Sequence, residues 1–382
     1  MTSIRISILA VVLACAAFAG SNVGAQGLAG LREPPRLASE PFPAPAAAKS
    51  DTLQQSVTKF DNHTNSRRGC PIMPPFLHEG DSVAIVSPGF YTPLNEISEI
   101  KAVLSSWGLV PFVAPNVGEH QAGRVAGPAT HRFDDMQWAL INKSFKAVFC
   151  SRGGYGTLHL LPYLDTSYFA RYPKWIVGYS DITTLHAVSV LGGTMSVHGA
   201  VGRELGSRKV NKMNYLLLHD LLFGTLPRYQ VNTPNGYNLQ GRASGRLVGG
   251  NLSTLTTLLS TDFDVTRLDS IILFIEDVDE PFHNIDRMFN MLRIHGVFDR
   301  CVGLVLGGFC KCKKDLGCET VYELLYPYFK DLGIPVLCDF PTGHGSYNFP
   351  LLEGAHATLV VGDASSSLFF NIDGRWMPVG YP

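Results

Sequence analysis

From residue 81 onward, short apolar runs alternate with longer segments of helical spacing. The apolar runs predict strands at 82–86, 110–113, 147–150 and 175–177. Between them, 96–107 has apolar residues three and four positions apart, and 132–142 is interpreted as a second helix. This alternation predicts an α/β domain with a parallel sheet whose faces are covered. Binding is then expected at the carboxyl ends of the strands, where Ser87, Gly153 and Ser180 fall.

A second region of mixed pattern begins near residue 241. It follows a segment at 210–240 that we interpret as a helix and a crossover. Further elements are expected as strands at 270–275 and 302–306, a helix at 285–295 and short strands within 356–382. We therefore predict a smaller, strand-rich mixed α/β domain over 241–382, beside a first domain over 69–209.

The first 68 residues are not expected to belong to the folded part. Residues 1–25 have a positive residue, an apolar stretch and a small-residue cleavage site, which is the pattern of an export signal. Residues 26–68 are rich in Ala, Pro and Ser without an apolar period and predict a disordered linker. No later run is apolar for about twenty residues, so we expect no stable membrane insertion. The expected location is periplasmic or secreted, and Cys15 leaves a lipid anchor open.

Composition and charge narrow the classes of partner. The chain has 382 residues, 46% of them hydrophobic and 16% charged, which is enough apolar material for the cores of two domains. The formal net charge is −1 and there is no long basic run, so no nucleic-acid partner is expected.

Cysteines and histidines do not predict a metal site. The C-x-C-x5-C spacing of Cys310, Cys312 and Cys318 differs from the paired C-x-x-C of zinc sites. We interpret it as a loop with one disulfide or as free thiols. His283 and His295 have no partner at metal-ligand spacing, so a catalytic zinc is not expected. No other cofactor is predicted.

The stretch 175–186 is the centre of the candidate site. An apolar strand ends at Val177, Gly178 gives a sharp turn two places before Ser180, and Asp-Ile-Thr-Thr opens a helix directly after that serine. A serine at such a corner stands clear of the sheet at the positive end of a helix, where a nucleophile would be placed. The G-x-S-x-G pattern is only half met, because Ile182 takes the place of the second glycine. The alternative is that the serine merely caps the helix.

Three other segments could complete such a site. The glycine-rich turn at 152–156 precedes a helix expected from Leu158, and it could present backbone N–H groups to negative charge or be only a tight turn. Glu276 ends an apolar run and either caps local backbone or faces a site. His344 lies between two glycines, which gives an imidazole the access that a general base needs, although most lone histidines are structural.

In these segments the sequence resembles the LD-carboxypeptidase family of serine peptidases, which includes a microcin-cleaving immunity protein. Several motifs match in the same order, and together they are more specific than any one of them. The matching stretches are 151–156 with 160–162, 178–183, 249–252, 274–277, 286–288 and 343–344. They span about 80–365, which is nearly the whole folded part.

The resemblance implies a Ser-Glu-His triad with Ser180 as nucleophile, Glu276 as orienting acid and His344 as general base. It places an oxyanion hole on the backbone N–H groups of Gly154 and Asp181. It also implies a flavodoxin-like amino-terminal domain, a β-rich carboxy-terminal domain and a homodimer. The family's usual substrate is a murein tetrapeptide, from which a terminal D-alanine is released across an L,D bond.

Substrate contacts are expected from three side chains. Arg152 would bind the terminal carboxylate, Tyr155 lies in the glycine-rich turn, and His198 would line the same crevice. His186, inside the helix after the elbow, and Cys150 are interpreted as core residues.

Departures from the family pattern leave the substrate open. Many relatives have Arg where His159 stands and Pro where Ala200 stands, and the export signal differs from the cytoplasmic enzymes. That signal suggests work on peptidoglycan fragments outside the inner membrane. Two alternatives therefore stay open. The same triad could cleave a peptide–nucleotide antibiotic or another amide, or the protein could bind muropeptides without cleaving them.

Overall fold

The computed structural model describes residues 71–120, 123–207, 210–232, 235–372 and 375–381. The predicted export signal, the predicted linker and Cys15 lie outside these residues.

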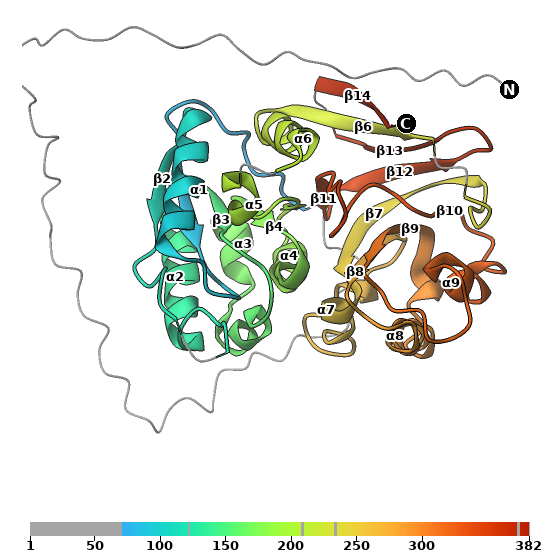
Figure 1. Ribbon diagram of the computed structural model, residues 1–382. Coiled ribbons are helices and arrows are strands. Elements are labelled where there is room, and N and C mark those ends of the chain that lie inside the picture. Colours follow the sequence, from blue (N-terminus) through green and yellow to red (C-terminus); the bar gives the residue numbers. More distant parts are fainter. Residues whose placement is uncertain (1–70, 121–122, 208–209, 233–234, 373–374, 382) are drawn as a thin grey trace, which may run out of the picture. The chain divides into compact units, whose positions relative to one another are not determined.

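The first sheet has the strand order of a flavodoxin-like domain (Figure 1). Its strands are β1 (Ser82–Val86), β2 (Val110–Val113), β3 (Phe145–Cys150), β4 (Trp175–Gly178), β5 (Ser196–His198) and β11 (Leu351–Glu353). They are ordered β2-β1-β3-β4-β5-β11, and the first five are parallel. The order 2-1-3-4-5 is that of flavodoxin, so the expected parallel sheet is confirmed. The antiparallel strand β11 comes from far along the chain and pairs with β5.

Six helices accompany this sheet among the described residues. They are α1 (Leu94–Ser106), α2 (Ala129–Ile141), α3 (Ser167–Arg171), α4 (Thr183–Leu191), α5 (Gly202–Gly206) and α6 (Lys212–Leu222). The helix α1 buries Ile97, Ile100 and Leu104, which confirms the spacing read from the sequence. The segment expected to be a helix from Leu158 is a 3₁₀ helix, η2 (Thr157–Tyr163), with Pro162 inside it. Proline lacks the N–H that an α-helical turn would need at that position.

The second sheet is mixed and, with eight strands, is not the smaller of the two. Its strands are β6 (Thr225–Val231), β7 (Gly241–Asn251), β8 (Ile271–Val278), β9 (Cys301–Cys310), β10 (Val336–Leu337), β12 (His356–Val361), β13 (Ser366–Phe370) and β14 (Arg375–Tyr381). Strands β7 to β10 are parallel, and β12, β13 and β6 continue the sheet antiparallel. The strand β6 lies in the segment that we interpreted as a crossover.

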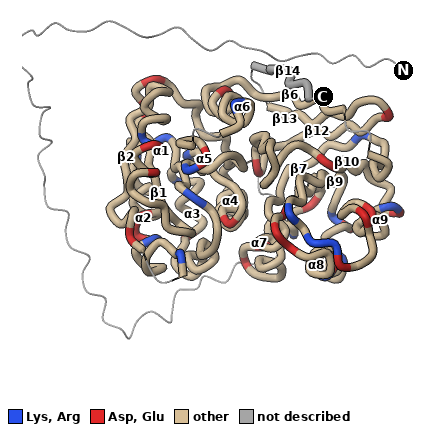
Figure 2. The backbone as a smooth tube through the Cα atoms, viewed as in Figure 1, with Lys and Arg blue, Asp and Glu red and all other residues tan. Residues whose placement is uncertain are grey.

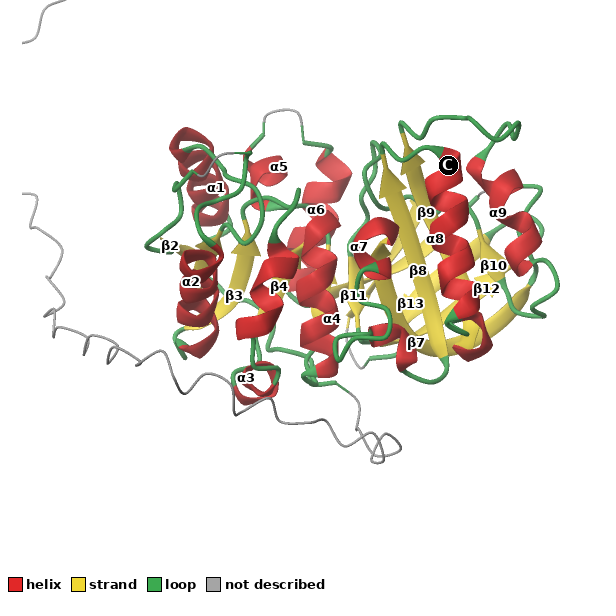
Figure 3. Cartoon of the chain, turned by 90° about the horizontal axis from the view of Figure 1, so that it is seen from below, coloured by secondary structure: helices red, strands yellow, loops and turns green. Residues whose placement is uncertain are grey.

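Three helices accompany this sheet, α7 (Leu252–Thr256), α8 (Phe282–Ile294) and α9 (Val321–Phe329). Figure 3 shows α8 and α9 beside the strands β8 and β9. The first seven residues of β8 are buried, as expected for a central parallel strand covered on both faces. Short 3₁₀ helices, η4 (Val265–Arg267) and η5 (Phe298–Arg300), lie in the loops before β8 and β9.

The helix that follows the candidate nucleophile contacts both sheets. The helix α4 packs on β5 and β7, and β11 also contacts β7. Across this boundary, the backbone N–H of Asn251 donates to Thr183 Oγ1 at 3.0 Å. The site described below therefore lies where residues of both sheets meet.

Charged residues of both signs are interspersed with long uncharged segments (Figure 2). The six cysteines of the described residues are free thiols, so the disulfide considered for Cys310, Cys312 and Cys318 does not form. Among the helices that the structure describes, none is long and apolar enough to cross a bilayer.

Candidate active site

Ser180 occupies a strained corner between β4 and α4. Its φ is +66°, in the left-handed region that residues other than glycine rarely adopt. Such a conformation costs on the order of 1–3 kcal/mol and is typical of a nucleophile elbow. The Ser180 side chain caps neither η3 (Ser180–Ile182) nor α4. Instead its hydroxyl lies 3.1 Å from Nε2 of His344. This geometry favours the nucleophile over the helix cap.

His344 is presented by the loop that follows β10. Its side chain is 15% exposed, so the imidazole is mostly shielded from solvent but still accessible from the surface. The preceding Gly343 has a φ of +106°, and a Cβ there would lie 2.6 Å from Glu276 Oε2. The side chain of Asn348 holds the loop, because its Oδ1 accepts from the Gly343 N–H at 3.1 Å. The N–H of Asn348 in turn donates to Asn214 Oδ1 on α6 at 2.8 Å.

Glu276 lies in β8 where the pairing with β9 slips by one residue. Ile275 pairs with Leu306, but Asp277 pairs with Phe309, so β9 carries one extra residue opposite Glu276. Such a bulge re-aims a side chain next to a site. The Glu276 side chain is fully buried, and its Oε2 lies 2.6 Å from Nδ1 of His344.

These contacts form one row of hydrogen-bonding groups. A carboxylate can only accept, so Nδ1 of His344 carries the proton toward Glu276 and Nε2 is free to accept from Ser180 Oγ. The serine and the histidine are 164 residues apart in sequence, and the histidine and the glutamate 68. The chain thus brings together the three side chains that the resemblance implied. Such a row can activate a hydroxyl for attack.

Electrostatics at His344 are dominated by two opposing effects. Burial alone lowers the pKa of the imidazole. The charge and hydrogen bond of Glu276 outweigh it, with smaller contributions from Glu204 and Asp277, so the pKa is raised above its ordinary value. The group therefore needs a higher pH than a free histidine to act as a base.

The glycine-rich turn lies against the elbow. A Cβ on Gly153 would lie 3.0 Å from Ser180 Cβ and 3.4 Å from the Asp181 nitrogen. Gly154 has a φ of +97°, and a Cβ there would overlap the ring of Phe90. The N–H groups expected to form the oxyanion hole, those of Gly154 and Asp181, therefore belong to two neighbouring turns.

Two buried side chains tie those turns together. The Asp181 carboxylate accepts from Thr157 N at 2.9 Å and from Thr157 Oγ1 at 2.6 Å. Burial raises the pKa of Asp181, although the Thr157 hydrogen bonds oppose this. Arg132 of α2 donates to the carbonyls of Gly156, at 2.7 Å, and Pro88. Sequence reasoning missed both Thr157 and Arg132.

Of the residues expected at this edge, Ser87 is structural and Arg152 lies close to the elbow. Ser87 is buried, and its hydroxyl lies 2.7 Å from that of Ser151. The Arg152 guanidinium is 5.4 Å from the centre of the Phe90 ring and donates to Tyr91 O at 3.4 Å. Tyr155 is 53% exposed, and its hydroxyl lies 3.2 Å from His159 Nε2, so it points to the surface.

The other histidines expected near the crevice are buried. His198 is fully buried between the rings of Tyr179 and Phe274, and burial lowers its pKa well below the ordinary value. This position does not favour the substrate contact that we expected. His186 is a core residue as predicted, with Ser196 Oγ 2.8 Å from Nδ1 and the Gly178 carbonyl 2.8 Å from Nε2. Cys150 is likewise buried in the core.

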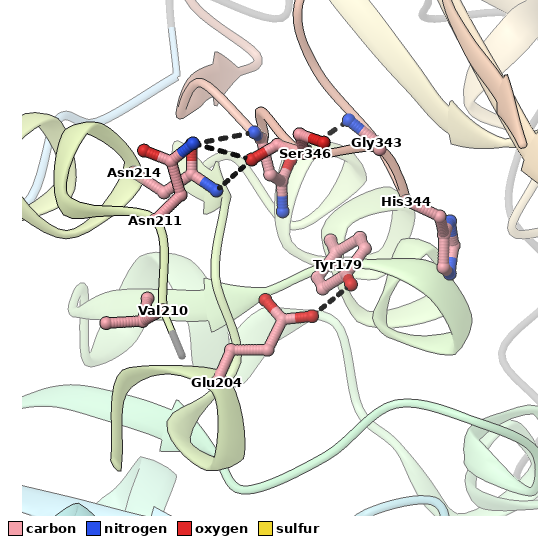
Figure 4. A pocket seen from close by; sticks show the side chains of 10 residues that line it. Tyr179, Glu204, Val210, Asn211, Asn214, Gly343, His344 and Ser346 are labelled. Atoms are coloured by element: carbon pink, nitrogen blue, oxygen red, sulfur yellow. Dashed lines mark hydrogen bonds between the residues drawn. The ribbon is translucent and has the colours of Figure 1, made fainter. Parts of the chain in front are cut away.

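A cavity of about 400 Å³ opens beside His344 (Figure 4). Tyr179 and Glu204 lie on one side of it, and Asn211, Asn214 and Ser346 on the other. The Tyr179 hydroxyl donates to Glu204, and its ring centre is 4.8 Å from that of His344. Sequence reasoning gave no role to Glu204, because nothing in its local pattern marks it.

Among the described residues, no group of three or more His, Cys, Asp or Glu side chains could hold a metal ion. A serine on a strand-to-helix corner of a parallel sheet, in line with an imidazole and a buried carboxylate, is the arrangement of serine hydrolases. Fold and site thus define that class.

Comparison with known proteins identifies the family within this class. Residues 83–199 match the model of the LD-carboxypeptidase N-terminal domain, and 244–359 match that of the LD-carboxypeptidase C-terminal domain. The chain belongs to the LD-carboxypeptidase family and is a serine-type carboxypeptidase.

Three relatives illustrate the range of the family. The probable murein peptide carboxypeptidase of Bacillus subtilis is 32% identical over 294 residues, 75% of this chain and 91% of its own. The crystal structure of muramoyltetrapeptide carboxypeptidase from Oxalobacter formigenes has a TM-score of 0.69 at 27% identity, covering 76% of this chain and 99% of its own. The microcin C7 self-immunity protein MccF of Escherichia coli is 26% identical over 252 residues, 57% of this chain and 72% of its own.

Proposed function

We propose that this chain hydrolyses the L,D-peptide bond before the terminal D-alanine of murein tetrapeptides. The observation that carries the proposal is the row from Ser180 through His344 to Glu276, with contacts of 3.1 and 2.6 Å. The names of the relatives from Bacillus subtilis and Oxalobacter formigenes support murein peptides as the substrate class.

The proposed mechanism follows from these positions. Ser180 Oγ attacks the carbonyl before the D-residue while its proton passes to His344 Nε2. Glu276 holds the imidazole and stabilises the imidazolium that forms. The N–H groups of Gly154 and Asp181 stabilise the oxyanion, a kind of contact whose loss costs on the order of 10²–10³ in rate. His344 then protonates the leaving amine, and water resolves the acyl-enzyme with the same base.

A carboxypeptidase also has to recognise a terminal carboxylate. We assign this role to Arg152, the first residue of the glycine-rich turn, whose guanidinium lies beside the ring of Phe90. A planar guanidinium can bind a carboxylate through two parallel hydrogen bonds. Its half-buried position next to Gly153 supports this assignment.

We further propose that the protein is exported and acts as a homodimer on peptidoglycan fragments outside the inner membrane. The pattern of residues 1–25 supports export, and the family resemblance supports the dimer. Fractionation of cells and the molar mass of the purified protein in solution test the two statements separately.

The function is tested with the Ser180→Ala variant and mass spectrometry of muropeptides. The wild-type protein should remove one alanine from tetrapeptides, and the variant should remove none while keeping its far-UV circular dichroism. Full activity in the variant would remove Ser180 from the mechanism. Binding of muropeptides without turnover by the wild-type protein would favour a non-catalytic binding protein.

A second candidate substrate is a peptide–nucleotide conjugate or another amide, cleaved by the same residues. The similarity to MccF, a self-immunity protein against microcin C7, favours keeping it. Parallel assays of a murein tetrapeptide and an aminoacyl-sulfamoyl nucleoside discriminate the two, because the preferred substrate should have the higher kcat/KM.

A further inference from the structure

Tyr179 joins the imidazole of His344 to a carboxylate that the proposed mechanism does not use. The tyrosine directly precedes the proposed nucleophile, and its ring centre lies 4.8 Å from that of His344, with 52° between the two ring planes. Its hydroxyl donates to Glu204 Oε1 on the short helix α5 (Figure 4). A row of contacts therefore runs from Glu204 through Tyr179 to the proposed general base.

The Tyr179 side chain is enclosed by its surroundings. It is 7% exposed, and a second ring, that of His198, has its centre 5.8 Å away. Burial, with the charge and the hydrogen bond of Glu204, raises the pKa of Tyr179 well above its ordinary value, so the hydroxyl keeps the proton that it donates. The ring cannot turn away from His344 without breaking the hydrogen bond to Glu204.

The Glu204 carboxylate is partly buried, and its neighbourhood offers it little positive charge. The adjacent Arg203 is engaged elsewhere, because its Nε lies 2.6 Å from Glu96 Oε2. Among the described residues that line the cavity, the ionisable groups are Tyr179, Glu204 and His344. Burial raises the pKa of Glu204, whereas the hydrogen bond from Tyr179 and the charge of His344 oppose this. Along the described wall, His344 is therefore the group that can present a positive charge to Glu204.

We propose that Tyr179 and Glu204 are a positioning pair for His344. The ring of Tyr179 holds the imidazole with Nε2 toward Ser180, and the Glu204 carboxylate both anchors that ring and stabilises the imidazolium that forms when the serine proton is taken up. The inference rests on the proposed function, in which His344 is the general base. It assigns to the pair an effect on kcat rather than on the binding of substrate.

The need for such a pair follows from the two halves of the reaction. Before acylation the imidazole has two contacts at its edge, 3.1 Å to Ser180 Oγ and 2.6 Å to Glu276 Oε2. Once Ser180 carries the acyl group, its oxygen has no proton to donate, and the contact with Glu276 alone remains of these two. The imidazole could then pivot about one hydrogen bond while it has to activate water. Packing of the Tyr179 ring against the imidazole opposes this pivot.

Several ionisable groups surround His344, and their effects have to be separated. They are Glu276 and Asp277 of β8, Glu204 of α5, Tyr179 of the elbow, His198 of β5 and, beside Gly345, Cys310 of β9. Burial lowers the pKa of the imidazole, whereas Glu276 raises it most and Glu204 and Asp277 raise it less. Replacing Glu204 by glutamine removes one of these charges without changing the hydrogen bonds between Ser180, His344 and Glu276.

The first experiment changes Tyr179 and follows kcat and KM on a murein tetrapeptide. Tyr179→Phe keeps the ring and loses the hydrogen bond to Glu204, so kcat should fall about three- to tenfold, the usual worth of one hydrogen bond. Tyr179→Leu also removes the ring, and kcat should fall about ten- to a hundredfold, as expected when a reacting group is misplaced by up to about 1 Å. KM should stay within about threefold in both variants, since the loss is in the reaction and not in binding. Tyr163→Phe, at a tyrosine that is 48% exposed on η2, is the matched control and should change neither quantity.

The second experiment removes the charge of Glu204 and keeps its oxygen. In Glu204→Gln the amide oxygen can still accept from Tyr179, so kcat at high pH should stay within about threefold of the wild-type value. The pH at which kcat/KM rises should be lower, because one of the charges that favour the imidazolium is gone. The same change should appear in the titration of His344, followed by NMR of protein labelled with 15N-histidine, and the His344→Ala spectrum identifies the resonance.

Glu99→Gln is the matched control for the charge. Glu99 is exposed on α1 and lies against Gly206 of α5, so this variant removes a carboxylate close by but outside the cavity. Both the pH dependence of kcat/KM and the titration of His344 should stay as in the wild-type protein.

Each outcome decides one statement. A rise in KM with kcat unchanged would place Tyr179 in substrate binding and overturn the positioning role, and an unchanged titration of His344 in Glu204→Gln would overturn the role of the charge. If the wild-type protein cleaves no tetrapeptide, the proposed function fails, and the NMR measurement decides the pair alone. The Nδ1 proton that faces Glu276 should give a low-field resonance in the wild-type protein that broadens in Tyr179→Leu. An equally sharp resonance in both would show that the ring does not hold the imidazole.

Discussion

The two sides of the candidate site are built in different ways. On the nucleophile side, the glycine-rich turn and the elbow follow the adjacent parallel strands β3 and β4, within about thirty residues of each other in the chain. Asp181 and Thr157 join these two turns directly, and Arg132 of α2 also donates to the carbonyl of Gly156. The edge of one sheet is therefore sufficient to place the serine and the N–H groups expected to bind the oxyanion.

On the acid–base side, positions depend on contacts between distant segments. Glu276 comes from β8 of the second sheet, opposite the extra residue of β9, and His344 from a loop 68 residues later. That loop is held in turn by Asn214 of α6, which is 134 residues from its partner Asn348. The comparison teaches that the nucleophile is fixed by local backbone geometry, whereas the base is fixed by tertiary packing. Substitutions on the two sides of the site should therefore have different effects on the enzyme.

The largest effect is expected from removing the base. His344→Ala should lower kcat by on the order of 10⁴–10⁶, because the variant removes the imidazole nitrogen that lies 3.1 Å from Ser180 Oγ and would accept its proton. The Ser180→Ala/His344→Ala double variant should be no slower than either single variant, since the residues act as a unit. Steady-state release of D-alanine measures all three. Losses that multiply in the double variant would show that the two residues act independently.

The next largest effect is expected at Glu276, where a substitution should change both kcat and the pH dependence of kcat/KM. Glu276→Gln should lower kcat by on the order of 10²–10⁴, because the amide can stabilise the wrong tautomer of His344. The wild-type kcat/KM should rise with pH through a value above about 6.5, since Glu276 favours the protonated imidazole and the base has to be neutral. In the Glu276→Gln variant, the pH at which kcat/KM rises should be lower. Glu280→Gln, two residues beyond the end of the same strand, should leave the pH dependence of kcat/KM unchanged. An unchanged pH dependence in both variants would contradict the pairing of Glu276 with His344.

The sequence predicted the nucleophile side better than the acid–base side. The strand β1 was found with its exact bounds because a parallel strand buried on both faces leaves a continuous apolar run. The edge strand β2 was also found with its exact bounds, although Val110 and Phe112 are exposed. The elbow was also visible, since glycine and serine at a strand-to-helix corner form a local pattern. The roles of Glu276 and His344 came from the family resemblance, because their own segments allowed structural alternatives.

What the sequence missed depends on long-range contacts. The strands β5, β10 and β11 have two or three residues each, too few for a period, and are defined by their neighbours in the sheets. The helix α9 was missed, and its pattern is interrupted by Pro327. Glu204 gains its contact with Tyr179, and Asn348 its contact with Asn214, only when segments distant in the sequence come together, so no local signal marks them.

A smaller effect is expected at Gly343. In Gly343→Ala the new Cβ would lie 2.6 Å from Glu276 Oε2, and the positive φ would be strained by about 1–3 kcal/mol. The loop has to shift, so kcat should fall by about ten- to a hundredfold while the nucleophile stays in place. Gly345→Ala is the matched control, because its Cβ would only reach ordinary contact with Cys310 Sγ at 3.5 Å. A serine-directed phosphonate should still label Ser180 in both variants, more slowly in the first, and equal kcat in the two would contradict the argument.

The smallest effect is expected from the hydrogen bonds of Thr157 to Asp181, which join the two turns on the nucleophile side. Thr157→Val removes the hydroxyl that donates to Asp181 at 2.6 Å, leaving the buried carboxylate with the Thr157 N–H alone. An unsatisfied buried group costs about 1–3 kcal/mol, so the free energy of unfolding in urea should fall by that amount. Because the turn that carries Gly154 stays hydrogen-bonded through its backbone, kcat should fall only about three- to tenfold, with KM nearly unchanged. Thr157→Ser keeps the donor and should restore both quantities. A loss of stability with no change in kcat would show that this hydrogen bond holds the fold without aligning the oxyanion hole, and the local side of the comparison would then rest on the strained backbone of Ser180 alone.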